Sequence, residues 1–550
     1  MTIKQLIFPL FTLAWIAAAL PIGAYDAHSI LITTIAFTCA SLSLLTACPT
    51  ITIPKTPLII LGGAFWALAG ISVTFSEAPV ISYIFFIIFT LFPLAVITIY
   101  TLLKQNIITL RTLLISAAAI SAILIINAFI QRIFFEQHLR FGLVQWPLAN
   151  PNTMAGLLSL FFFMMLGGIL AAKDKAHKIT FLILALGLFS SLTMTGSRGA
   201  FLALLGSFAI FSTCLWPQIK SNDKYIITLI IICATAFAAF ELIDPANTIG
   251  KNLVNQGAQH ADHLWHRAEI WRAGWQMFLD RPVIGSGIGT FHLYYPEYRS
   301  GDTTSGGFAA HNDPLQFAIE MGATAPILFY AFLAAGLTLT IRAFGVLAEP
   351  HRIALLTIFC ALGAFIVHTH MTFHFMFASL LITTGGLVGA WLFLLDKASP
   401  FETWQTHTAT RPIIAFIGIA LTLIFLSLQL GNILTESAGT AKRAGDLTRH
   451  ATLINAADKI TKGHSPNALI YASQLSLSAL ETNPNMSAEQ RQAAYSRALN
   501  LLARAQTLNP RAPSIYATRA KLYTAFGYPD KAAPQWAKFR KLIWNHKSSK

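Results

Sequence analysis

The feature that most constrains this chain is a series of long apolar runs. A run of about 17–25 apolar residues is long enough to cross the hydrocarbon core of a bilayer as one helix. Only 11% of the 550 residues are charged, less than half of the roughly 25% found in soluble proteins. We therefore expect an all-α polytopic membrane protein with about 13 transmembrane helices, at residues 6–25, 30–47, 58–75, 80–103, 112–130, 153–172, 179–195, 200–216, 225–243, 315–341, 353–367, 375–395 and 413–430.

The positions of the basic residues predict the orientation. If the N-terminus lies inside, the inner connections hold most of the Lys and Arg residues, whereas the short outer loops hold only Arg132, Arg140 and Arg198. Inner loops of membrane proteins carry such an excess of positive charge. The transmembrane domain would then cover residues 1–433, with a large outer loop at 244–312. The C-terminal segment 434–550 would also lie outside, although an error of one span would move it inside.

The formal net charge of +15 raises the question of nucleic acid. We expect no nucleic-acid partner, because the basic residues of the apolar part stand in short connections between spans and not in one continuous patch. The five cysteines lie in or beside apolar runs and lack metal-ligand spacing. The bilayer is the expected surrounding of the chain.

The C-terminal segment is predicted to be helical. Alanine-rich stretches with helical spacing are broken at "LNP" (508–510) and "GYPDKA" (527–532). This pattern resembles tetratricopeptide (TPR) repeats of about 34 residues. A generic helical cap is the alternative, because such arrays usually need about three repeats to be stable.

The stretch "AAHNDPLQFAIEMG" (309–322) carries the strongest chemical pattern. Asp313, which is followed by a proline, predicts a helix start, with the aspartate as N-cap. His311 would then lie just before a spanning helix, at its electropositive outer end, where a neutral imidazole can accept a proton. Asn312, Gln316 and Glu320 recur every four residues and share one face of that helix. They either support a polar site or bond neighbouring helices.

Three arginines are candidates for binding an anion. Arg198 lies in "TGSRGA", in a glycine-flanked turn on the outer side. Arg267 and Arg272 lie in the outer loop, on a predicted amphipathic helix that Trp271 and Trp275 would anchor at the membrane interface. A guanidinium offers a planar fork to phosphate oxygens, although exposed or lipid-facing positions are the alternative for each.

Other polar motifs give weaker indications. "GSGIGTF" (285–291) lacks the Lys of a phosphate-binding loop and predicts a turn. In "HTHMTFHF" (368–375), His370 and His374 have helical metal-ligand spacing but no accompanying Glu. We expect polar contacts at the outer surface there, and no metal. Asn152 is predicted to cap the helix that follows "ANPNTM" (149–154).

Together, "GSRGA" (196–200), "R-x-x-x-W" with "RPVIGSGIGTF" (267–291), and "HNDPLQ" with "EMG" (311–322) resemble the O-antigen ligase superfamily. That group includes O-antigen ligases, O-antigen polymerases and protein O-oligosaccharyltransferases, and the resemblance covers residues 140–390. It implies a GT-C-like, metal-independent inverting glycosyltransferase of the bacterial inner membrane, without a cofactor and with a periplasmic active site. The donor would be a glycan on undecaprenyl diphosphate. His311 aligns with the catalytic histidine, and Arg198 and Arg267 align with the diphosphate-binding arginines. Arg272 is a further candidate for that role.

The resemblance leaves the acceptor open among the lipid A core, a protein and a second glycan. Protein O-oligosaccharyltransferases usually carry a segment like "HSLLEYPL" where this chain has "HTHMTFHF", which argues against a protein acceptor. A polymerase that joins lipid-linked repeat units shares the same catalytic logic and stays open as the alternative. A transporter is disfavoured because the polar groups gather on one side and the sequence lacks internal symmetry. An assembly factor with an inert membrane part would not need His311 or Arg198.

Overall fold

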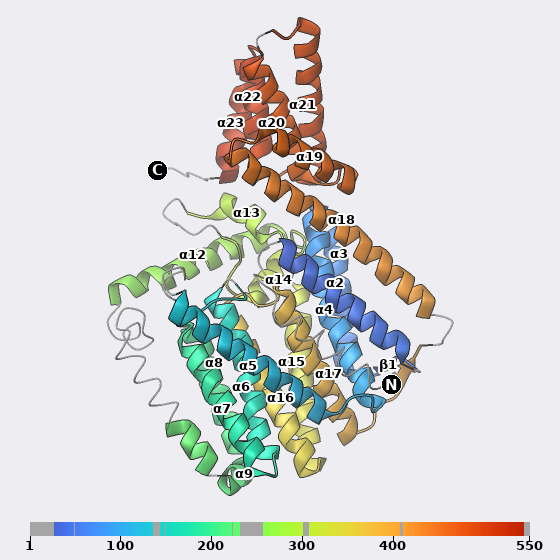
Figure 1. The fold of residues 1–550 in the computed structure, drawn as a ribbon, viewed down its shortest axis with the longest axis vertical. Coiled ribbons are helices and arrows are strands. Elements are labelled where there is room, and N and C mark those ends of the chain that lie inside the picture. The colour runs from blue at the N-terminus through green and yellow to red at the C-terminus, as the bar shows by residue number, and fades with distance from the viewer. Residues whose placement is uncertain are drawn as a thin grey trace.

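The computed structural model describes residues 27–48, 50–135, 143–148, 150–222, 224–231, 257–300, 307–406, 411–483 and 485–543. The predicted span 6–25 and most of the span 225–243 lie outside the described residues. The described chain is almost entirely helical, with a bundle of long helices below and a smaller helical unit above it (Figure 1). This agrees with the all-α prediction.

Nine helices within the described residues are long and apolar enough to cross a membrane. They identify a multi-pass membrane protein, although the full number of 13 spans stays a prediction. The nine are α3 (Pro57–Thr74), α4 (Pro79–Lys104), α5 (Leu110–Phe134), α6 (Pro151–Ala171), α7 (Lys175–Thr193), α15 (Thr324–Val346), α16 (Glu349–Thr369), α17 (Ala378–Ala398) and α18 (Arg411–Arg443). The bundle also contains α2 (Ala27–Ala47), α8 (Arg198–Cys214) and α9 (Trp216–Ser221).

The predicted span 315–341 is wrong as a single helix. The chain forms a short helix, α14 (Asp313–Met321), and then the long α15, with a break at Gly322. Gly322 has φ +81°, a conformation that favours glycine, and a Cβ at this position would collide with the carbonyl of Val283. Close packing against that loop therefore ends α14, and α15 alone has the length of a span.

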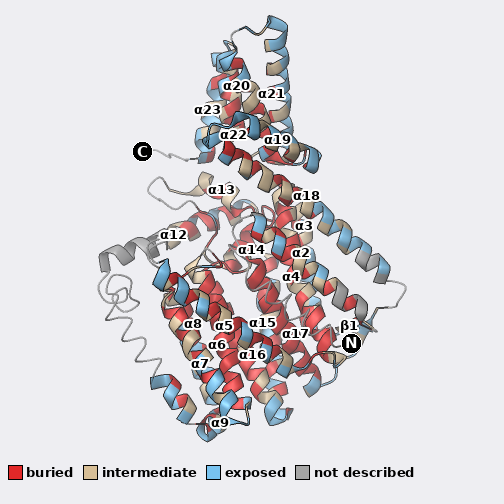
Figure 2. Ribbon diagram, in the orientation of Figure 1, coloured by how far each residue is buried: buried red, intermediate tan, exposed pale blue. Residues whose placement is uncertain are grey.

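The centre of the bundle is formed by α6 and α17. In their most apolar stretches of 18 residues, 94% of the residues of α6 and 100% of those of α17 are buried (Figure 2). Two glycines let α17 approach α4 closely. A Cβ at Gly385 or Gly389 would lie 2.6 Å from the carbonyl oxygen of Phe92 or Val96, respectively. Small residues four apart allow such packing between membrane helices, where dispersion forces replace the hydrophobic effect.

The connections that the sequence places inside gather at one end of the bundle. There β1 (Thr52–Pro54) pairs antiparallel with β2 (Thr403–Gln405), which joins the α2–α3 and α17–α18 connections. The Nζ of Lys55 lies 3.1 Å from a carboxylate oxygen of Glu402, and Lys104 forms an ion pair with Asp396. These described connections, which the sequence predicts on the inner side, therefore lie together at one end of the bundle.

The opposite end is covered by α12 (Gly257–Asp280), α13 (Phe291–Tyr298) and α14, and the helical C-terminal unit lies above them (Figure 1). The long helix α18 leads from the bundle into this unit. Its helices are α19 (Leu447–Thr461), α20 (Pro466–Thr482), α21 (Ala488–Leu508), α22 (Pro513–Ala525) and α23 (Pro529–Ile543). Their assignment as TPR repeats stays a prediction.

Arg511, just before α22, connects the C-terminal unit to the bundle. Its Nε donates to Glu77 of the α3–α4 connection at 3.0 Å, and its Nη1 donates to Glu297 of α13 at 2.9 Å. Its guanidinium also lies 3.5 Å from the ring centroid of Tyr294. Arg281 binds the other carboxylate oxygen of Glu77. One guanidinium therefore joins three segments that are far apart in the sequence.

We predict that Arg511→Ala loosens the C-terminal unit from α13. The side chain is only 14% exposed, and hydrogen bonds to charged groups contribute about 1.5–3 kcal/mol each. Faster amide hydrogen exchange in residues 291–298 of the variant would be the expected result. Arg497→Ala, on the exposed face of α21, is the matched control and should leave that exchange unchanged. Equal exchange in both variants would contradict the proposed connection.

Candidate active site

His311 lies directly before α14, at the end of the bundle below the C-terminal unit. Its φ is +53°, in the left-handed region that few non-glycine residues adopt. Its ring meets the ring of Phe373 edge-on, with the centroids 4.9 Å apart. The imidazole makes no hydrogen bond with the described residues, and its Nδ1 is buried. The ring is held by its backbone and by packing, which leaves its nitrogens available to a ligand.

The helix start at α14 differs from the prediction. Asn312, not Asp313, is the N-cap, and its side-chain oxygen accepts the N–H of Leu315 at 3.0 Å. Asp313 is fully buried, and its carboxylate accepts the backbone N–H of His374 at 2.8 Å. The aspartate therefore joins α14 to the α16–α17 connection, because the neighbouring asparagine already satisfies the helix terminus.

Both backbone polar groups of Ala310, the residue before His311, are hydrogen-bonded. Its carbonyl accepts the indole N–H of Trp271 at 3.0 Å, and its N–H donates to the side-chain oxygen of Gln316 at 3.1 Å. The indole N–H of Trp271 therefore faces the His311 segment, and its role as a membrane anchor stays a prediction. Trp275 is 53% exposed, as an interfacial tryptophan would be.

Glu320 holds the turn that the sequence predicts at 285–291. Its carboxylate accepts the N–H groups of Gly289 at 2.7 Å and Phe291 at 3.0 Å, and the amide of Gln316 at 3.1 Å. Its side chain is buried. Glu320 and Gln316 thus support the His311 segment through a continuous set of hydrogen bonds, as a buried polar network must if it is to be stable.

Arg267 on α12 lies near Arg198, at the start of α8, and near His311. Burial and the positive charge of Arg198 lower the pKa of Arg267. Burial, with a smaller effect of the charge of Arg267, lowers the pKa of His311 to about 4. Arg267 has no ion-pair partner within the described part of the chain. Two neighbouring guanidiniums favour a ligand that brings negative charge.

Arg272, by contrast, does not join this cluster. Its exposed guanidinium pairs with the carboxylate of Glu269 at 3.0 Å, three residues earlier on α12. Glu269 also accepts the hydroxyl of Ser300 at 2.9 Å. This ion pair occupies the outer face of the helix, whereas Arg267 lies on a different face.

The histidines at 368 and 374 are buried, which corrects the expectation of outer-surface contacts. The exposed fraction is 2% for His368 and 0% for His374. The Nε2 of His374 lies 3.0 Å from the Nδ1 of His368, and the Nε2 of His368 lies 3.3 Å from the hydroxyl of Ser197. That hydroxyl donates to Asn152 at 2.8 Å. The network thus ends beside Arg198.

The bond directions define the protonation of this network. Because the Ser197 hydroxyl donates to Asn152, His368 must donate from Nε2 and accept at Nδ1. His374 then donates from Nε2, and its buried Nδ1 carries no proton and has no hydrogen-bond partner among the described residues. Burial and the neighbouring His368 hold the pKa of His374 well below its usual range. The ring of His374 is therefore neutral.

Close packing fixes the ring of His374. Phe365 stacks on it at 4.7 Å between centroids, and a Cβ at Gly156 would lie 2.6 Å from its Cε1.

Asn152 takes part in this hydrogen-bond network and does not cap α6 as predicted, because Asn150 is the N-cap. The sequence contained these histidines but did not indicate that His368 meets Ser197, 171 positions away, or that His374 meets His368.

The predicted absence of a metal can be examined only in the described residues. They contain no group of three or more His, Cys, Asp or Glu residues that could hold a metal ion. His370 and His374, whose spacing suggested ligands, face different partners. The Nε2 of His370 lies 2.9 Å from the hydroxyl of Tyr330, whereas His374 meets His368.

Residues 180–330 match a family model described as O-antigen ligase. The match confirms the resemblance to the O-antigen ligase superfamily. It includes Arg198, Arg267 and His311, and it ends before His368 and His374. A comparison with curated proteins gives no match.

We predict that Glu320→Ala destabilises the His311 segment. The substitution leaves two buried backbone N–H groups without an acceptor, and each unsatisfied group costs about 1–3 kcal/mol. The thermal unfolding temperature of the detergent-purified protein should fall clearly. Glu481→Ala, at the exposed end of α20, should shift it little, since such surface changes stay within about 0.5 kcal/mol. Equal unfolding temperatures for the two variants would contradict the assigned role.

Proposed function

We propose that this chain transfers a glycan from undecaprenyl diphosphate to an acceptor hydroxyl at the periplasmic face of the bacterial inner membrane. The observation that carries the proposal is that Arg267 lies close enough to both Arg198 and His311 for charge to act between them: Arg198 acts on Arg267, and Arg267 acts on His311. These residues come from three segments, and all lie within the part that matches the O-antigen ligase family. In this proposal His311 is the general base, and Arg198 and Arg267 bind the diphosphate.

The proposed reaction is a single displacement at the anomeric carbon. The acceptor hydroxyl gives its proton to His311 as its oxygen forms the bond to that carbon. The bond between the anomeric carbon and the diphosphate oxygen breaks, and the lipid diphosphate leaves with the electron pair. Because attack and departure take place on opposite faces, the configuration inverts. Arg198 and Arg267 neutralise the charge that grows on the leaving group, which lowers the barrier.

The low pKa of His311 fixes its protonation state near neutral pH. An imidazole with a pKa of about 4 is unprotonated there. It can accept the hydroxyl proton while the bond to carbon forms, and the nearby Arg267 favours return of that proton. The buried pair of His368 and His374 supports the base indirectly, because His374 is bonded to Asp313 two residues after His311. His368 and His374 support His311 by position alone and transfer no proton in the proposed reaction.

The acceptor and the number of transfers belong to the proposal and are open to experiment. A lipid A core acceptor fits a ligase, and the segment 368–375 differs from that of protein-specific enzymes. Product analysis separates ligase from polymerase. A ligase adds one preassembled glycan, whereas a polymerase yields a ladder of repeat units.

We predict that His311→Ala lowers the transfer rate by about 10²–10⁴-fold, the usual contribution of a general base. The assay uses the full-length protein in liposomes with an undecaprenyl-diphosphate-linked glycan and lipid A core. His370→Ala is the matched control, because His370 lies in the same end of the bundle but bonds to Tyr330. The control should keep the rate of the unchanged protein. Normal transfer by the His311 variant would overturn the mechanism.

The low pKa of His311 also predicts the pH dependence of transfer. The neutral ring is active, so the rate should be constant between about pH 5 and 7 and should fall as the pH drops through about 4. Arg267→Gln removes a positive charge, which should raise the pKa of His311 and move this acidic limb to higher pH. Arg272→Gln should leave the limb in place, since Arg272 pairs with Glu269. An acidic limb near pH 6.5 in the unchanged protein would contradict the assignment.

A further inference from the structure

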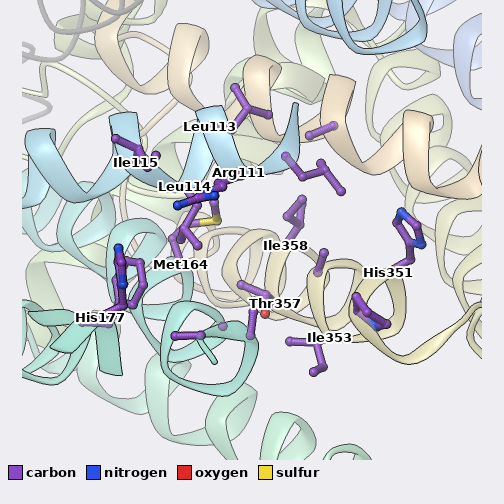
Figure 3. A pocket seen from close by; sticks show the side chains of 18 of the residues that line it. Arg111, Leu113, Leu114, Ile115, Met164, His177, His351, Ile353, Thr357 and Ile358 are labelled. Atoms are coloured by element: carbon purple, nitrogen blue, oxygen red, sulfur yellow. The ribbon is translucent and has the colours of Figure 1, made fainter. Parts of the chain in front are cut away.

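A cavity of about 560 Å³ lies at the end of the bundle opposite His311, between α5, α6, α7, α16 and α17 (Figure 3). Its volume falls within the range of about 300–1,000 Å³ that is usual for ligand sites. Its deeper wall is apolar and is formed by Leu113, Met164, Phe181, Ile353, Ile358 and Leu387. The proposed reaction at His311 makes no use of this cavity.

The rim of the cavity is basic. Arg111, Lys173, His177 and His351 line it, together with Asp174 as the acidic residue of the lining. Asp174 is already engaged, because it caps α7 by accepting the N–H of His177 at 2.9 Å and contacts that imidazole at 2.6 Å. Within the described part of the chain, Arg111 and Lys173 have no carboxylate partner. The rim therefore offers two cations to an external anion.

The start of α16 adds to this electropositive rim. Pro350 and His351, in its first turn, line the cavity, and no side chain caps this terminus. By contrast, Thr109 caps α5 and Asp174 caps α7. The free N–H groups of a first helical turn favour a negative charge. Glu349 lies at the same helix start but is not part of the cavity wall.

A single polar group lies within the apolar part. The hydroxyl of Thr357 lines the cavity, is buried, and has no hydrogen-bond partner among the described residues. It follows His351 by six positions on α16, which corresponds to about 9 Å along the helix. A buried hydroxyl without a partner costs free energy. A ligand atom that accepts a hydrogen bond, placed between the charged end of the ligand and its apolar part, would pair with the Thr357 hydroxyl.

We propose that this cavity binds one anionic glycerophospholipid of the surrounding bilayer. The phosphate lies between Arg111, Lys173 and the first turn of α16, an ester carbonyl accepts the Thr357 hydroxyl, and one acyl chain follows the apolar wall. Basic pockets between membrane helices bind anionic head groups in this manner. The order of a basic rim, one hydroxyl and an apolar wall matches the order of groups in such a lipid. The proposal is independent of the transfer reaction.

The test is native mass spectrometry of the full-length protein in detergent, with phosphatidylglycerol or phosphatidylcholine added at equal concentration. The unchanged protein should retain one phosphatidylglycerol in preference to phosphatidylcholine. Arg111→Gln with Lys173→Gln should weaken that binding by about tenfold or more. Lys175→Gln with Lys220→Gln is the matched control, because it removes two exposed cations at the same end that do not line the cavity. It should leave binding unchanged.

A second variant tests the apolar part without a change of charge. Ala354 lines the cavity, so Ala354→Phe should fill it and displace the lipid, while the unfolding temperature shows whether the fold persists. Equal weakening by the control pair, or equal binding of phosphatidylcholine, would overturn the proposal. It would also fail if undecaprenyl phosphate bound more tightly than phosphatidylglycerol and the Arg111 and Lys173 variant abolished that binding, since the occupant would then be a polyprenyl carrier.

Discussion

The arrangement of the site depends on two buried carboxylates of one short helix, α14. Asp313 accepts the N–H of His374 and so fixes the α16–α17 connection. Glu320 accepts the N–H groups of Gly289 and Phe291 and so fixes the turn before α13. A buried carboxylate without such donors would be strongly unfavourable. The hydrogen bonds that stabilise these two buried carboxylates therefore also position His311 between the α16–α17 connection and the turn before α13.

The site also illustrates where a membrane protein can concentrate polar groups. Apolar surfaces occupy the length of the spans, so polar side chains gather where the helices end. Arg198, Arg267, His368 and His374 all lie at such ends or connections, although they are widely separated in the sequence. At the opposite end, the basic rim around Arg111 follows the same rule, with an apolar wall instead of a buried network.

The C-terminal unit lies at the same end of the bundle as His311. The ion pairs that attach it to the bundle involve residues that take no part in the proposed transfer reaction. Arg511 joins Glu77, in the α3–α4 connection, to Glu297 of α13, which belongs to the layer that covers the bundle. α13 is therefore held both by the C-terminal unit and, through Glu320, by α14. A large acceptor would have to approach the site past this layer.

The sequence by itself determined that the chain is an all-α, multi-pass membrane protein, and it indicated the resemblance to O-antigen ligases, because length, hydropathy and short motifs are local properties. It also singled out His311, Arg198 and Arg267. Only the tertiary structure decided that Gly322 divides a predicted span, that the indole N–H of Trp271 faces the His311 segment, and that Arg272 pairs with Glu269. The histidine pair next to Ser197 and the capping roles at α6 and α14 were likewise beyond prediction. These outcomes depend on which distant segments pack together, and periodicity along one segment carries no information about its partner.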